Sequence, residues 1–284
     1  MIADNEKYKD FANHANILTT NILNRNTFVI ALLLTIQIHV FAQQNINNVM
    51  CNKYTLCSQQ GSTAISSSKT GLASIDKSFA YFSFSQDYCL NELWNAGAHY
   101  AWKNKTGCLP INIICKGPSY NTNIKLSIDY SLFIFNNFAV SAGLISNYNI
   151  IKSSNNLFSA GCELGMQYSY KKITIGMYAK YPALFHKKTD ISWSDLILET
   201  ALSYKFFEKG SINIGFRKQQ FSKLEFIANF ISQITKKCYM MVAYNSASGE
   251  CCCGLTYMTK KINITLNAAL NINIGVTPSI GIQL

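Results

Sequence analysis

Apolar and polar residues alternate along most of the chain after residue 120. From Ile124 to Leu132, one face carries Ile, Leu, Ile, Tyr and Leu, while the other carries Lys, Ser, Asp and Ser. A period of two residues is typical of a β-strand with one apolar face. The pattern runs to Asn136 and Asn137 and restarts at Phe138. This arrangement predicts two long strands joined by a tight polar turn.

The same unit of strand, turn and strand recurs toward the end of the chain. The predicted short turns lie at Lys171–Lys172, Glu208–Gly210, Lys236–Lys237 and Lys260–Lys261, and the last strand covers Ser279–Leu284. Weaker alternation predicts further strands at Ser78–Tyr88, Ala96–Trp102 and Cys108–Cys115. Strand boundaries taken from pattern are uncertain by a few residues, so we expect about fourteen antiparallel strands, within a range of roughly 12 to 14.

Strand length separates two all-β architectures that both show alternation. Strands of a soluble sandwich are usually about 6 residues long, whereas a tilted strand that crosses a membrane needs about 9 to 11. The predicted strands are of the longer kind, and their second face carries Ser, Asn, Thr, Gly and Gln with few charges. Such a face suits a wet barrel interior. The sequence therefore favours a single antiparallel transmembrane β-barrel over a sandwich.

The connections between the predicted strands alternate in length, and this alternation orients the barrel. The short turns fall on the same side as the end of the last strand, which we expect to be the periplasmic side. The opposite connections are expected to face outward. They are Lys152–Asn156, Pro182–Asp195, Lys218–Ser222, Ser246–Cys251 and Asn271–Pro278. Short periplasmic turns and longer outer loops are the usual asymmetry of outer-membrane barrels.

A separate apolar run lies near the start of the chain. Arg25 precedes the apolar segment Thr27–Ile36, and Ala42 supplies a small residue before a cleavage site. This order is typical of a secretory signal peptide, and the run is shorter than the roughly 20 residues that a spanning helix requires. An uncleaved membrane anchor is the alternative. The predicted organisation is a signal peptide at 1–42, a periplasmic N-terminal segment or plug at 43–76 and an outer-membrane barrel at 77–284.

Composition limits the partners of the mature chain. The 284 residues are 49% apolar, which excludes a disordered chain. The formal net charge is +11, and residues 1–42 carry as many basic as acidic side chains, so the mature chain keeps this excess. Basic proteins can bind nucleic acid, but the lysine pairs fall in turns, and export separates the protein from nucleic acid. We expect a monomeric barrel surrounded by outer-membrane lipid, with no nucleic-acid partner.

The sequence contains no recognisable catalytic, cofactor-binding or metal-binding motif. Ten cysteines occur, and the run Cys251–Cys253 falls in a predicted outer loop, yet no Cys-x-x-Cys pair or nearby histidine completes a zinc pattern. His186, Asp190 and Ser192 lie too close in sequence for a hydrolase triad and lack a Gly-x-Ser-x-Gly motif. Cys162 lies on an apolar face and is interpreted as a small hydrophobic residue. The sequence therefore predicts a protein that is not an enzyme and needs no cofactor.

Several short segments within Ala64–Leu284 occur in an order that is found in a known family. They are Asp87–Tyr88, Asn91–Trp94, His99–Trp102, Lys116–Gly117, Tyr130–Ser131, Ser141–Gly143, Ile175–Met177, Tyr181–Pro182 and Ala201–Tyr204. This order resembles the PorV-like outer-membrane barrels of Bacteroidota, which are similar to the FadL-type fatty-acid transporters. The chain departs from that family in lacking an early Asn-Pro-Ala segment and in ending on Leu284 instead of an aromatic residue.

The resemblance implies a non-enzymatic outer-membrane barrel with one of two roles. The first is transport of apolar small molecules, and the second is an accessory role in type IX-like protein secretion, with a secretion-system protein as partner. The alternative is a structural or surface-interaction barrel that binds a partner protein through the outer loops around Pro182–Asp195 and Ser246–Cys253.

Overall fold

A computed structural model describes residues 54, 56–66, 68–90, 92–118, 121–152, 157–186, 196–206, 210–219, 222–259 and 261–284. The predicted signal peptide at 1–42 lies outside these residues and stays a prediction, as do the proposed domain boundaries. No helix among the described residues has the length and apolar character that crossing a membrane requires.

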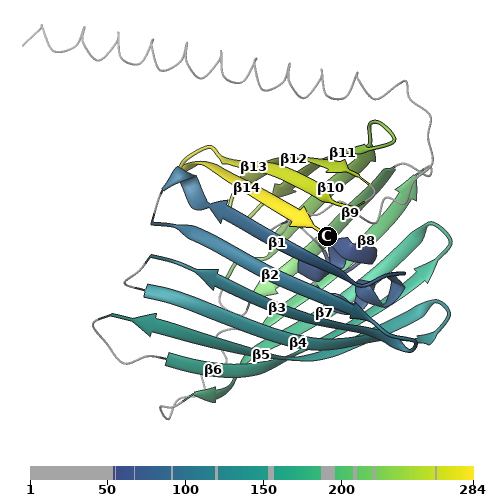
Figure 1. Cartoon of the computed structure of the whole chain (residues 1–284), viewed down its shortest axis with the longest axis horizontal. Coiled ribbons are helices and arrows are strands. Elements are labelled where there is room, and N and C mark those ends of the chain that lie inside the picture. Colours follow the sequence, from purple (N-terminus) through teal and green to yellow (C-terminus); the bar gives the residue numbers. More distant parts are fainter. Residues whose placement is uncertain are drawn as a thin grey trace, which may run out of the picture. The chain divides into compact units, whose positions relative to one another are not determined.

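Fourteen antiparallel strands form a closed barrel (Figure 1). The strands are β1 (Phe79–Gln86), β2 (Trp94–Lys103), β3 (Gly107–Lys116), β4 (Asn121–Phe135), β5 (Phe138–Ile151), β6 (Leu157–Tyr170), β7 (Ile173–His186), β8 (Ile197–Phe206), β9 (Gly210–Gln219), β10 (Glu225–Gln233), β11 (Cys238–Asn245), β12 (Glu250–Met258), β13 (Asn263–Asn271) and β14 (Gly275–Gln283). The predicted fold class and strand number are confirmed.

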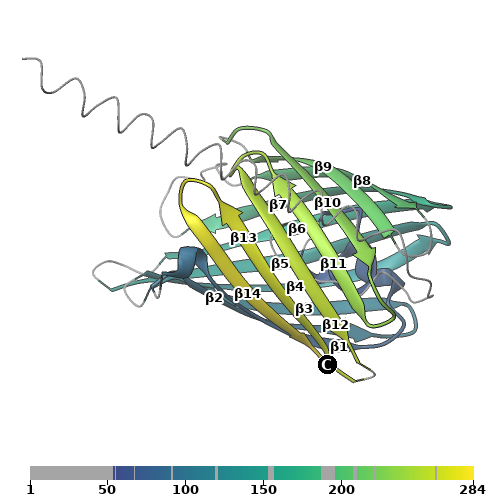
Figure 2. The same cartoon turned by 90° about the horizontal axis from the view of Figure 1, so that it is seen from above.

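Closure depends on the pairing of the first strand with the last. Strand β1 pairs with β14 from Tyr81 opposite Gln283 to Ser85 opposite Ser279. Each other strand pairs with its neighbours in sequence, so the sheet has no free edge; β1 and β14 lie side by side in Figures 1 and 2. A sandwich would keep two open sheets, and this alternative is therefore excluded. Closure also satisfies the backbone hydrogen bonds that lipid could not satisfy.

Alternation along each strand produces an apolar outer surface and a polar lumen. On β6, Leu164 is 57% exposed on the outside, whereas its neighbour Glu163 is 2% exposed inside. On β13, Leu266 is exposed on the outside while Thr265 is buried inside. Tyrosines such as Tyr170 and Tyr204 are exposed near the ends of their strands. An apolar band with aromatic residues near its border is the surface that a lipid bilayer requires.

The two ends of the barrel differ in the length of their connections. We call the end where β1 begins and β14 finishes the turn end, and the opposite end the loop end. Connections at the turn end have two to four residues, and the longest connection at the loop end has ten. Lys171 adopts a φ of 52° in the two-residue turn between β6 and β7. The predicted short turns all fall at the turn end.

Three of the predicted outer connections are shorter than the sequence indicated. Strand β7 continues through Pro182 to His186, strand β12 begins at Glu250 and contains Cys251–Cys253, and strand β14 begins at Gly275 and contains Pro278. The prediction that the cysteine run lies in an outer loop is therefore wrong. Cysteine is small and apolar enough to fit either face of the wall, which is why Cys251 and Cys253 point outward while Cys252 is buried inside.

Pro278 lies within β14 although proline lacks the backbone N–H that a ladder requires. It pairs with Ala268 on β13, whereas the pairing of β14 with β1 begins only at Ser279. Proline therefore occupies a position of β14 that is paired on one side, where a missing donor costs little.

Candidate functional site

Part of the chain before β1 lies inside the barrel. We call the described residues between Tyr54 and Asp76 the lumen segment; it contains two short 3-10 helices, η3 (Gly61–Ser66) and η4 (Lys69–Ser74). Helix η4 contacts β3, β4, β5 and β6, and the helices appear in purple within the barrel in Figure 1. Leu56, Ala64 and Leu72 are fully buried. The segment therefore fills much of the lumen, and the candidate site lies where the lumen segment meets the barrel wall.

Lys69 at the start of η4 connects the lumen segment to the wall. Its ammonium lies 3.4 Å from Oε1 of Glu163 on β6, and both side chains are almost completely buried. The hydroxyl of Ser131 donates to the Lys69 carbonyl over 2.7 Å. Burial would lower the pKa of Lys69, but the carboxylates of Glu163 and Asp129 outweigh this effect and raise the pKa above its usual value. Lys69 therefore remains charged inside the barrel.

A second attachment lies on β8 and β9. The backbone N–H of Cys57 donates to Oε1 of Glu199 over 2.6 Å, and the guanidinium of Arg217 lies 2.7 Å from Oε2 of the same carboxylate. Burial, followed by the charge of Glu199, raises the pKa of the Cys57 thiol well above its usual range. Cys57 is therefore a neutral thiol that packs in the interior and is no candidate nucleophile.

A third attachment lies near the loop end and involves three parts of the chain. The Tyr54 hydroxyl donates to Oε2 of Glu250 over 2.9 Å, and the Tyr88 hydroxyl donates to Oε1 over 3.3 Å. Tyr88 lies in the connection between β1 and β2, where it and Cys89 adopt φ values of 56° and 57°. These left-handed conformations are unusual for residues other than glycine. One wall carboxylate thus ties the lumen segment and an outer connection together.

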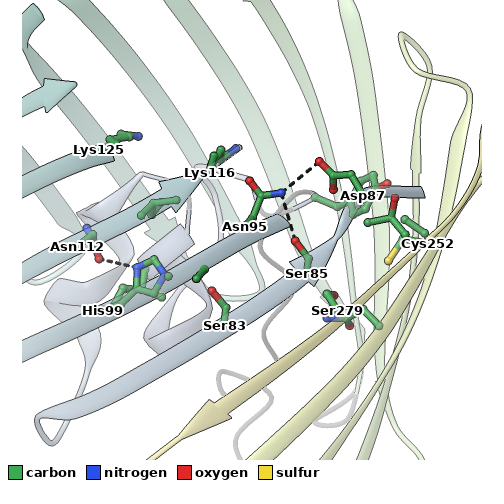
Figure 3. Close-up of a pocket in the computed structure, with 18 of the residues that line it drawn as sticks. Ser83, Ser85, Asp87, Asn95, His99, Asn112, Lys116, Lys125, Cys252 and Ser279 are labelled. Carbon is green, nitrogen blue, oxygen red and sulfur yellow. Dashed lines mark hydrogen bonds between the residues drawn. The ribbon is translucent and has the colours of Figure 1, made fainter. Parts of the chain in front are cut away.

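A cavity of about 380 Å³ remains between the lumen segment and the wall. Its wall comes mainly from β1 to β4 and β12 to β14, and Tyr54, Ile65 and Lys69 contribute from the lumen segment. Figure 3 shows Asn95 between Asp87 and Ser85, with its amide nitrogen 3.1 Å from Oδ2 of Asp87. This volume is in the usual range for a small-molecule site.

Hydrogen bonds hold several lining side chains in place. Nδ1 of His99 lies 2.9 Å from Oδ1 of Asn112 (Figure 3), and the amide nitrogen of Asn112 donates to Ser127 over 3.0 Å. Lys116 and Lys125 extend into the same space from β3 and β4. The cavity is therefore lined by positioned polar groups and cationic side chains.

Among the sequence candidates whose side chains the structure describes, Cys252 lines this cavity, whereas Cys162, Cys251 and Cys253 do not. Asp190 and Ser192 lie outside the described residues, and for His186 the structure describes only its place in β7. Cys162 is partly buried on the outer face of β6, as its position in the alternation indicated. Within the described residues, no group of three or more His, Cys, Asp or Glu side chains could hold a metal ion.

Sequence reasoning missed the residues that do form the site. The polar face of Ile124–Leu132 already displayed Lys125, Ser127 and Asp129 as inward positions. What the pattern did not contain was their partner, because Lys69 precedes them by more than fifty residues and lies in a stretch without alternation.

No protein-family model matches this sequence. A search of curated proteins also returns no match. Solved structures do match. The toluene transporter TbuX of Ralstonia pickettii has a TM-score of 0.62 at 9% identity, over 86% of this chain and 99% of that one. The toluene transporter TodX of Pseudomonas putida has a TM-score of 0.60 at 7% identity, over 87% and 98%. A Pseudomonas aeruginosa FadL homologue has a TM-score of 0.57 at 10% identity, over 86% and 98%.

These values show a shared fold. The chain has the fold of FadL-type transport barrels and spans nearly the full length of the structures it matches. The resemblance to FadL-type transporters that the sequence indicated is therefore confirmed at the level of fold. None of the named structural matches is a PorV-like protein, so that part stays a prediction.

Proposed function

We propose that this protein is a non-enzymatic outer-membrane barrel that passes small molecules through a partly filled lumen. The observation that carries the proposal is the combination of an apolar exterior, a closed wall and a polar cavity beside the lumen segment. The wall suits lipid, and the cavity offers a place for a solute on its way through. The toluene transporters TbuX and TodX, which share the fold, are transporters by name and not enzymes.

The same features support a location in the outer membrane. A closed barrel with an apolar exterior is one of only two backbone arrangements that a bilayer core accepts. With the predicted signal peptide, the chain would be exported, and the turn end would face the periplasm. An accessory role in type IX secretion has no support among the named structural matches. The surface-interaction alternative involves two outer segments, Pro182–Asp195 and Ser246–Cys253. Residues 187–195 lie outside the described part of the chain, and the second segment is a short connection that leads into β12.

The test is passage of solutes through purified protein in lipid vesicles. The protein should first show heat-modifiable gel mobility, because a closed barrel resists detergent until it is boiled. We expect vesicles with folded protein to take up small labelled solutes faster than vesicles with the boiled protein. If the two kinds of vesicle took up neutral, cationic and anionic solutes at the same rates, transport would be rejected.

A further inference from the structure

The cavity differs chemically from a site for hydrocarbons. Of its 21 lining residues, fifteen carry a hydroxyl, amide, imidazole or charged group, and only six do not. The apolar members include Ile65 on the lumen segment and Ile114 on β3. A hydrocarbon placed here would displace water from hydroxyl, amide and charged groups and offer no hydrogen bond in return, which costs free energy. The lining therefore suits a solute that can itself accept hydrogen bonds.

The charged groups that reach the cavity are mostly cations. Among the described residues of the lining, Lys69, Lys116, Lys125 and Arg217 are basic, whereas Asp87 is the only one with a carboxyl group. Glu163 and Glu199 pair with Lys69 and Arg217 but do not line the cavity. A solute in the cavity is therefore closer to the ammonium and guanidinium groups than to the carboxylates behind them.

The cluster around Lys125 contains one more basic side chain than acidic ones. Lys125 interacts electrostatically with Lys180, Lys69 and Glu163. Asp129 interacts with the same Lys69 and with Glu163. Three lysine side chains thus lie around two acidic side chains, and one of these, Glu163, also accepts a hydrogen bond from Tyr178. A bound anion would stabilise the protonated form of these lysines, because opposite charges attract strongly away from bulk water.

We propose that this cavity binds small hydrophilic carboxylates and selects them over hydrocarbons, with Lys125 as the main charge that holds the anion. The inference rests on the proposed transport function and names the class of solute. The hydroxyl and amide groups of Ser127 and Asn112 are placed to hydrogen-bond the carboxylate beside Lys125. Ammonium groups form strong, charge-assisted hydrogen bonds with carboxylates.

The experiment compares three probes on the purified full-length barrel. Succinate is the anion, succinamide is its uncharged counterpart of similar size, and toluene is the hydrocarbon named for the structural matches. Binding is measured by titration calorimetry in detergent, and passage of succinate and succinamide is measured in vesicles. We expect succinate to bind at least about tenfold more tightly than succinamide or toluene, as the loss of a charged hydrogen bond would imply.

Two variants identify the contribution of Lys125. Lys125→Gln removes the charge and should weaken succinate binding about tenfold while leaving succinamide unchanged. Lys125→Arg keeps the charge and should retain most of the binding. The matched control is Lys236→Gln, which makes the same change at an exposed position in the turn between β10 and β11. Heat-modifiable mobility shows that each variant forms the barrel.

The outcomes separate this inference from the transport function. Equal binding of succinate and succinamide, tighter binding of toluene, or an unchanged succinate affinity in Lys125→Gln would overturn the anion site even if solutes pass. Tight, Lys125-dependent succinate binding without passage of any solute would support the site and reject transport.

Discussion

The link between Lys69 and Glu163 offers a direct test of how the lumen is held closed. Replacing Lys69 by methionine keeps a long unbranched side chain but removes the ammonium that lies 3.4 Å from the Glu163 carboxylate. Glu163 is 2% exposed, so the substitution leaves a buried carboxylate without its principal counter-charge. Removing one partner of a buried ion pair typically costs about 3 to 5 kcal/mol.

The lower end of that range applies here, because Lys125 also interacts with Glu163 and remains in place. A cost of about 3 kcal/mol corresponds to a roughly 150-fold increase in the population of molecules whose lumen segment has detached from the barrel wall. The barrel itself should survive, since every strand pair forms without the lumen segment. We expect more frequent channel openings in planar bilayers and faster proteolysis within residues 56–74.

Two further variants make the result specific. Lys77→Met removes an exposed lysine close to β1 and should leave the opening frequency unchanged. Adding Glu163→Gln to Lys69→Met removes the orphaned carboxylate as well, and most of the closure should return. If Lys69→Met opened no more often than the unmodified protein, the ion pair would not hold the segment and the reasoning would be wrong.

Three other predictions concern the wall, the loop end and pH. Leu266→Lys should destabilise the barrel by about 2 to 4 kcal/mol, the cost of a lysine on the lipid-facing side of a strand near the middle of the bilayer. The control Asn273→Lys, in the connection between β13 and β14, should leave the stability unchanged. Urea unfolding of the protein in vesicles measures both. Tyr88→Phe removes one hydrogen bond to a charged group and should loosen the loop end by about 1.5 to 3 kcal/mol, seen as faster proteolysis there; unchanged cleavage would contradict the proposed attachment. The contribution of Lys69 is complete below its unfolded-state pKa and is lost only as pH rises through the raised pKa of the folded state. Channel opening should therefore not increase from about pH 7 to about 10, and a rise within this interval would count against a charged Lys69.

The outer surface of the barrel could be predicted because it depends on local alternation. Whether Leu164 faces lipid and Glu163 faces the lumen follows from their order in a strand. The turns could also be predicted, since paired lysines or asparagines interrupt the alternation between two strands. The strand ends at the loop end could not be predicted. Cys251–Cys253 and Pro278 carry weak or misleading local signals, and pairing with neighbouring strands decided their place.

The sequence by itself determined which residues face out, roughly where the chain turns and that the strands are long enough for a membrane. Only the tertiary structure decided that β1 meets β14, that Lys69 reaches Glu163, and that Tyr54 and Tyr88 share Glu250. The physical reason is the distance along the sequence over which each interaction acts. A two-residue period acts between neighbours in the chain, whereas the filling of the lumen joins residues 196 positions apart, and closure joins residues as far apart in sequence as Ala80 and Leu284.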